Sequence, residues 1–193
     1  ERHERHSYEL NPREAVNPII SPELGKSLRA SVVLSGPMLA RFGRASFPHP
    51  GGDLIGERPI DLFIEGFRAM GARVVEGKNT YELSAPKGLR GADIFFRLVS
   101  VTATETLMMA ATLADGTTTL RNAAMEPEIV ALAEMLRVSG ARIEGAGTST
   151  ITITGGKKLR AEKAFHMIPD RIAAGSFILL SALLGQGLSL EAC

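Results

Sequence analysis

The stretch that decides the fold is residues 103–114, ATETLMMAATLA, which has almost no polar face. Residues 31–40 and 172–184 have the same character, and a helix that is apolar on every side is buried on every side. We therefore expect three buried helices at the centre of an α/β molecule, with sheets and amphipathic helices around them. Pro37 lies inside the first of these helices and predicts a kink there.

The sequence repeats itself with a period of about 70 residues. Gly71-Ala72-Arg73 recurs as Gly140-Ala141-Arg142, and Leu89-Arg90 recurs as Leu159-Arg160. Each copy indicates an amphipathic helix, a Gly-Ala-Arg turn, two short strands, a third strand, an apolar helix and a closing strand. The predicted amphipathic helices are residues 60–70 and 128–138, and the predicted strands are residues 73–75, 80–83, 93–96, 142–144, 150–154, 163–167 and 188–193.

Three short patterns predict where helices begin. Thr102-x-x-Glu105 has the form of a capping box, and Pro127 suits the first position of a helix. Asp170 is a good N-cap for the last helix. We expect helix N-termini at residues 100–102 and 170–171, where backbone N–H groups can hold phosphate or carboxylate.

Composition excludes several classes of protein. The chain has 193 residues, and 22 basic against 21 acidic side chains give a net charge of +1, which excludes a global field for binding nucleic acid. The longest apolar run, residues 172–184, is too short for membrane insertion. A single cysteine, Cys193, excludes an intrachain disulfide and favours the cytoplasm. The chain begins with Glu rather than Met, so we expect a fragment of a longer protein.

The loop at residues 47–62, FPHPGGDLIGERPIDL, is rich in proline and glycine and carries Asp53, Glu57 and Arg58. One interpretation is a surface loop with solvated charges. The other is a mobile lid that brings an acid and a guanidinium to a bound anion. Residues 50–62 resemble the catalytic loop of the UDP-N-acetylglucosamine enolpyruvyl transferases.

Further motifs resemble the same family, in the same order along the chain, from about Gly25 to the end. They are Leu28-Arg29-Ala30-Ser31, Gly36-Pro37, residues 40–43, residues 99–104, residues 122–130 and Pro169-Asp170-Arg171-Ile172. The resemblance implies an inside-out α/β barrel with two domains, each built from three β-α-β-α-β-β units. Residues 1–167 would be the domain with the catalytic loop, and residues 168–193 the start of a second, incomplete domain.

The resemblance also implies a reaction, the first committed step of peptidoglycan synthesis. An enolpyruvyl group passes from phosphoenolpyruvate to the 3′-hydroxyl of UDP-N-acetylglucosamine, and phosphate is released. No metal or organic cofactor is implied, and the partners are these two substrates and the missing second half of the same chain.

Several residues take roles from the resemblance. Asp53 stands at the position of the general acid that protonates the methylene carbon, and Arg58 would pair with the phosphate or carboxylate. Asp170 and Arg171 would lie at the hinge between domains. The substrate-binding positions are Arg29, Arg58, Pro59, Ile60, Asp61, Leu62, Leu98, Val99, Ser100 and Val101.

The chain departs from the family at several positions. Asp53 replaces the usual Cys, and an unperturbed Asp at about 3.9 is ionised at neutral pH, so its pKa must rise before it can donate a proton. Leu98 replaces an expected lysine, so a phosphate contact is either lost or supplied by Arg97. Ala173 replaces a usual Glu. Two alternatives therefore stay open: the shikimate-pathway enolpyruvyl transferase, and a non-catalytic module that retains the fold.

Overall fold

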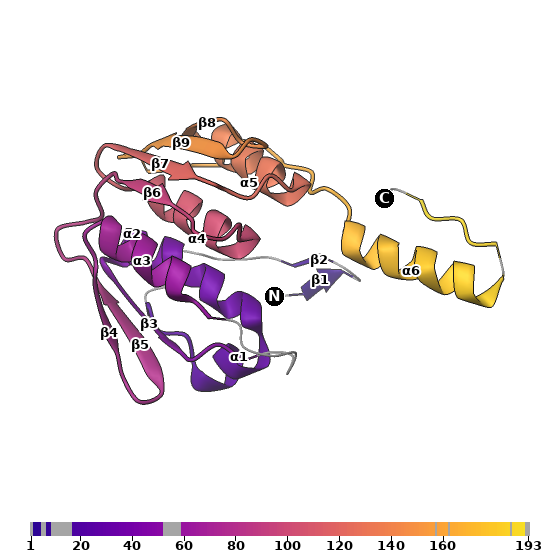
Figure 1. Cartoon of the computed structure of the whole chain (residues 1–193), viewed down its shortest axis with the longest axis horizontal. Helices are drawn as coiled ribbons and strands as arrows, with labels where there is room; N and C mark the ends of the chain where they lie inside the picture. Colours follow the sequence, from indigo (N-terminus) through magenta and orange to yellow (C-terminus); the bar gives the residue numbers. More distant parts are fainter. Residues whose placement is uncertain are drawn as a thin grey trace.

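The computed structural model describes residues 2–4, 7–8, 17–51, 59–156, 158–161, 163–185 and 187–191. Two copies of one unit form a body, and a C-terminal helix stands apart from it (Figure 1). The first copy contains η1 (Arg29–Leu34), α2 (Ser35–Phe42), β3 (Arg44–Pro48), α3 (Asp61–Ala69), β4 (Arg73–Glu76) and β5 (Thr80–Ser84). The second contains β6 (Asp93–Phe95), α4 (Val101–Ala111), β7 (Thr117–Arg121), α5 (Pro127–Val138), β8 (Arg142–Glu144) and β9 (Thr150–Thr154).

Equivalent strands of the two copies pair in equivalent ways. The first sheet has the order β3-β5-β4 and the second has the order β6-β7-β9-β8. In the second sheet β6 pairs with β7 in parallel, while β7 and β8 both pair with β9 antiparallel. In the first sheet Ile19 forms an isolated parallel bridge with Ser46 of β3. Ile19 thus corresponds to β6, which pairs in parallel with β7 in the second sheet. The repeat found in the sequence is therefore a repeat of structure.

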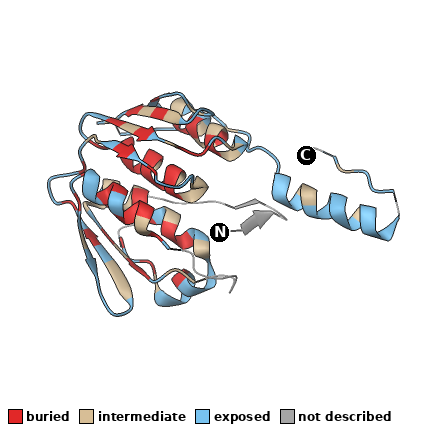
Figure 2. Cartoon of the chain, in the orientation of Figure 1, coloured by how far each residue is buried: buried red, intermediate tan, exposed pale blue. Residues whose placement is uncertain are grey.

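Buried residues gather between the two sheets (Figure 2). Helix α4 lies there, and Ala103, Leu107 and Met108 on it are fully buried, as the all-apolar pattern predicts. The two buried threonines of α4 have hydrogen-bond partners within the helix: Thr106 Oγ1 donates to the carbonyl of Thr102, and Thr104 Oγ1 donates to that of Ser100. This expected buried helix is confirmed.

Small residues let α2 and α3 approach α4 closely. A Cβ atom added at Gly36 would overlap the backbone oxygen of Thr106, and one added at Gly66 would overlap the side chain of Leu107. The contact at Gly36 requires glycine, because a side chain there would press on backbone and force the helices apart. The two copies are thus joined through close contact between α2 and α4.

The described part of the body forms two open sheets, one antiparallel and one mixed, and no closed barrel. The arrangement with helices inside and sheets outside is an α/β fold of the expected kind. The remaining elements are β1 (Arg2–Glu4) and β2 (Ser7–Tyr8), which pair with each other, α1 (Pro22–Ser27) and α6 (Arg171–Leu184). Within the described ranges no helix is long and apolar enough to cross a membrane.

Two predictions for the third apolar helix are wrong. None of the residues of α6 is buried, although the sequence of residues 172–184 predicts burial on all sides (Figure 2). Residues 163–167 form no strand, and neither do residues 188–191. In the second copy, β6 precedes α4 and β7 follows it in the sequence, and the two segments are strands because they pair with each other in parallel. Their counterparts around α6 form no sheet in the described part of the chain, and no core covers α6 there.

Two local predictions also differ from the structure. The helix expected at residues 31–40 is a 3-10 helix, η1, followed by α2, and Pro37 lies in the first turn of α2. At this position the missing N–H of proline removes no hydrogen bond of α2, because N–H groups of the first turn have no partner within the helix. The cap of α4 is Ser100 rather than Thr102, since Ser100 is extended and its Oγ accepts from the N–H of Ala103.

Candidate functional site

The predicted catalytic loop lies largely outside the described residues, because Asp53 and Arg58 fall within residues 52–58. The residues on either side of this segment are anchored to the same part of the chain. Gly51 N donates to the carbonyl of Gly25 at 3.0 Å, and a Cβ at Gly51 would overlap the backbone of Lys26. On the other side, Nη2 of Arg29 lies 3.5 Å from the carbonyl oxygen of Pro59. Both ends of the loop are thus tied to residues 25–29.

The predicted substrate-binding stretch at residues 59–62 begins α3. Ile60 and Leu62 are buried in the core, so their side chains serve packing. Asp61 is the first residue of α3 and is partly exposed. Its carboxylate forms an ion pair with the guanidinium of Arg97, which precedes α4.

The predicted stretch at residues 98–101 leads into α4. The side chains of Leu98 and Val99 are 60% and 56% exposed. Ser100 uses a lone pair to cap α4, and its hydroxyl proton remains available as a donor. Val101 is the first residue of the helix.

The Asp61–Arg97 pair joins the N-terminus of α3, in the first copy, to the entrance of α4, in the second. The Arg29 contact brings η1 to the same place. All the described residues predicted to bind substrate therefore lie in one cluster, which we call the helix-entrance cluster: Arg29, residues 59–62 and residues 97–101. The sequence suggests Arg97 only as a substitute for the lysine expected at position 98, and the ion pair with Asp61 places its guanidinium between the two helix entrances.

Asn122 begins the motif at residues 122–130, and its side chain has a structural role. It has a φ of 55°, a left-handed conformation that asparagine tolerates better than most residues. Its Nδ2 donates to the carbonyl of Phe96 at 2.8 Å, and the N–H of Ala124 donates to Thr104 Oγ1. The turn after β7 is thus fixed against α4 and the end of β6.

Residues 170–171, predicted as a hinge, lie where the chain leaves the body. Asp170 caps α6 as expected, because its Oδ1 accepts from the N–H groups of Ile172 and Ala173. Arg171 forms a bidentate ion pair with Glu128 of α5, which holds the pKa of that carboxyl below its usual range. Nearby, burial raises the pKa of Glu105, and the charge of Glu128 adds to the effect.

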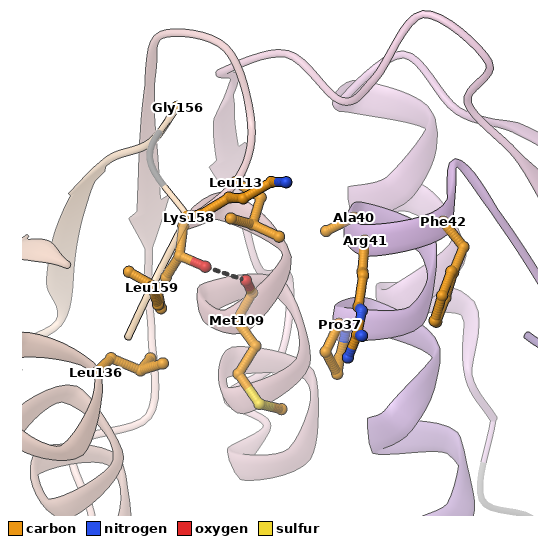
Figure 3. A pocket seen from close by; sticks show the side chains of 11 residues that line it. Pro37, Ala40, Arg41, Phe42, Met109, Leu113, Leu136, Gly156, Lys158 and Leu159 are labelled. Atoms are coloured by element: carbon orange, nitrogen blue, oxygen red, sulfur yellow. Dashed lines mark hydrogen bonds between the residues drawn. The ribbon is translucent and has the colours of Figure 1, made fainter. Parts of the chain in front are cut away.

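A groove of about 750 Å³ lies at the opposite ends of the buried helices (Figure 3). Pro37 and Ala40 of α2 form one wall, and Met109 of α4 lies opposite them. No residue of the helix-entrance cluster lines this groove. Among the described residues, no group of three or more His, Cys, Asp or Glu side chains could hold a metal ion.

Comparison with known proteins gives the family. The chain matches the EPSP synthase (3-phosphoshikimate 1-carboxyvinyltransferase) family over residues 3–193. The chain belongs to this family.

Solved structures support the fold of this member of the EPSP synthase family. An EPSP synthase from Acinetobacter baumannii aligns with a TM-score of 0.53 at 24% identity, over 68% of this chain and 29% of that one. The enolpyruvyl transferase NikO from Streptomyces tendae aligns with a TM-score of 0.59 at 22% identity, over 76% of this chain and 35% of that one. The family member described here thus spans about a third of the length of the solved chains that it matches.

Proposed function

We propose that this chain is part of an enzyme that transfers the enolpyruvyl group of phosphoenolpyruvate to the 3′-hydroxyl of UDP-N-acetylglucosamine and releases phosphate. The family supports carboxyvinyl transfer as the class of reaction. The motifs at residues 50–62 and 122–130 support the UDP-sugar as acceptor. The observation that carries the proposal is the helix-entrance cluster, in which three separately predicted substrate-binding segments lie together beside the ends of the predicted catalytic loop.

The cluster suits anionic substrates. Phosphoenolpyruvate and a nucleotide sugar both carry phosphate, and Arg29 and Arg97 are guanidinium groups that can bind phosphate with paired hydrogen bonds. The hydroxyl of Ser100 and the first N–H groups of α4 add neutral donors. We propose that Arg97 supplies the cation that Leu98 cannot, and that Asp61 holds its guanidinium in place.

The chemistry requires a proton donor and a partner for the leaving phosphate. We propose that Asp53 protonates the methylene carbon of phosphoenolpyruvate while the sugar 3′-oxygen bonds to the adjacent carbon and the 3′-hydroxyl gives its proton to a base in the second half of the cleft. The new methyl group then loses a proton as the carbon–oxygen bond to phosphate breaks, which restores the double bond and releases phosphate. Arg58 would neutralise charge on the phosphate that leaves. Asp53 must be protonated first, and closure of the loop over the anionic substrates would raise its pKa as required.

We also propose that residues 168–193 begin a second domain that completes the cleft. The all-apolar α6, which has no buried residue, supports this because such a helix needs a core around it. On this basis the isolated chain is expected to bind substrates weakly and to show no turnover.

A second acceptor is favoured by a specific observation. The family takes its description from 3-phosphoshikimate carboxyvinyl transfer, which makes shikimate 3-phosphate the competing acceptor. A module without activity is the third possibility, and Leu98 and Ala173 are the departures that favour it.

One assay separates these three functions. The complete gene product is incubated with phosphoenolpyruvate and either UDP-N-acetylglucosamine, shikimate 3-phosphate or no acceptor, and released phosphate is measured. We expect release that depends on the UDP-sugar. Release with shikimate 3-phosphate alone would transfer the assignment to that acceptor, and no release with either would support the inactive module.

A further inference from the structure

A bidentate ion pair joins α6 to the body. Nη2 of Arg171 lies 2.7 Å from Oε1 of Glu128, and Nε lies 3.1 Å from Oε2. Glu128 is in the first turn of α5, and Arg171 is the first residue of α6. The pair therefore connects the beginnings of two helices at the point where α6 leaves the body (Figure 1).

The paired geometry fixes direction as well as distance. Two parallel N–H···O bonds hold the plane of the guanidinium against the plane of the carboxylate, which a single contact does not do. Packing does not supply this constraint, because no residue of α6 is buried. Asp170 accepts from the first N–H groups of α6, so the helix axis is coupled to the chain immediately before Arg171.

The charges around Arg171 are otherwise acidic. Glu105 of α4 interacts with Glu128, and Glu126 and Asp170 act on Arg171. The Oε2 atom of Glu126 is buried and has no hydrogen-bond partner among the described residues. Without the guanidinium, the charge at the start of α6 would be that of Asp170 alone, and its repulsion by the acidic side chains of the body would favour orientations that move α6 away from α5.

We propose that Arg171 is a positioning residue: its ion pair with Glu128 sets the direction of α6 relative to α5, against the repulsion between Asp170 and the acidic side chains of the body. The inference concerns the orientation of one helix and needs no substrate. It can therefore fail or succeed independently of the proposed function.

The test measures the distance between α5 and α6 in the 193-residue chain. Spin labels are attached through V138C on α5 and L183C on α6, both exposed positions, after C193S removes the natural thiol. The distance distribution is then recorded by electron paramagnetic resonance. The parent chain should give one dominant distance, and R171Q should reduce the population at that distance by about two- to fivefold, the range for a well-formed exposed ion pair.

Rescue distinguishes positioning from general damage. The exchange E128R with R171E restores opposite charges and should recover the dominant distance, whereas R171E alone should broaden the distribution further than R171Q. The matched control is D93N, which removes another exposed bidentate pair, Asp93–Arg121, between β6 and β7. It should leave the distance unchanged. Thermal melts check that every variant folds.

The pH dependence gives a second readout. Because the folded-state pKa of Glu128 is lowered from 4.5, the pair should persist as pH falls below 4.5 and be lost only when Glu128 itself is protonated. A broad distance distribution in the parent chain, an unchanged distribution in R171Q, or failure of the charge exchange to restore it would each overturn the inference.

Discussion

At the scale of single residues, the choice of acid at position 53 has the largest chemical consequence. A carboxyl group can protonate carbon only if it carries a proton when substrate is bound, and an amide cannot do so at any pH. We expect D53N in the complete gene product to lower the rate of phosphate release by about 10²–10⁴-fold, the usual contribution of a general acid. Calorimetric binding of the UDP-sugar should be retained, and an active D53N enzyme would remove Asp53 from the mechanism.

The same residue predicts resistance to fosfomycin, an epoxide that alkylates the cysteine found at this position in most of the UDP-N-acetylglucosamine enolpyruvyl transferases that the loop resembles. A carboxylate is a poorer nucleophile than a thiolate, so mass spectrometry should find no adduct on residue 53. The control is D53C, which restores the thiol and should become alkylated. An adduct on Asp53 itself would contradict this explanation.

Arg97 provides a prediction with an internal control. If its guanidinium contacts the acceptor's diphosphate, R97A should raise KM for the UDP-sugar by about tenfold or more, with a smaller effect on kcat, because a charged hydrogen bond contributes about 1.5–3 kcal/mol. R121A removes another exposed arginine that is paired with a carboxylate, far along the chain in β7. It should leave KM unchanged, and equal effects of the two variants would argue against a role in binding.

At the scale of helices, close contact between α2 and α4 predicts a difference between two glycines. G36A would press a methyl group into the backbone of Thr106, and we expect it to lower the free energy of unfolding by about 1–3 kcal/mol. G175A makes the same change in α6, where the added Cβ would have no atom within 4 Å apart from its chain neighbours and the backbone of its own helix. It should be neutral or stabilise by up to about 1 kcal/mol, since alanine favours helix. Denaturant titration of both variants checks this.

Local patterns predicted most of the elements of the body. Strands β8 and β9 have the expected bounds, and the burial of α4 follows from its apolar sequence. Residues 163–167 show where prediction from local pattern fails. Their alternation of apolar and polar residues is compatible with a strand, but a strand forms only when a neighbouring strand pairs with it. The cap of α4 shows a similar limit, because both Ser100 and Thr102 suit an N-cap and only backbone conformation selects one.

At the scale of the whole molecule, the repeat predicted that two copies exist but not how they touch. Asp61 and Arg97 occupy different places in their copies, so a period of about 70 residues gives no hint that they pair. The helix-entrance cluster arises from packing between copies, which brings the entrances of α3 and α4 together. The sequence motifs located its members, and the three-dimensional arrangement was needed to add Arg97 and to assign Ile60 and Leu62 to the core.

The exposed apolar surface of α6 leads to a prediction about the molecule as a whole. Ile172, Leu179 and Leu183 are among its most exposed residues, and Leu183 is 84% exposed. Replacing all three with glutamine should leave the unfolding midpoint of the 193-residue chain unchanged, because none of them contributes to its core. L107A, in the buried helix α4, should instead cost about 2–5 kcal/mol.

The complete gene product should respond differently if α6 belongs to the core of a second domain, as proposed. There the triple glutamine variant buries three polar side chains, and it should lose stability by an amount comparable to that caused by L107A. Chemical denaturation of both proteins, with both variants, gives four values to compare. If the triple variant destabilises the 193-residue chain, α6 packs on the two-unit body; if it leaves the complete product unchanged, α6 is no part of a second core.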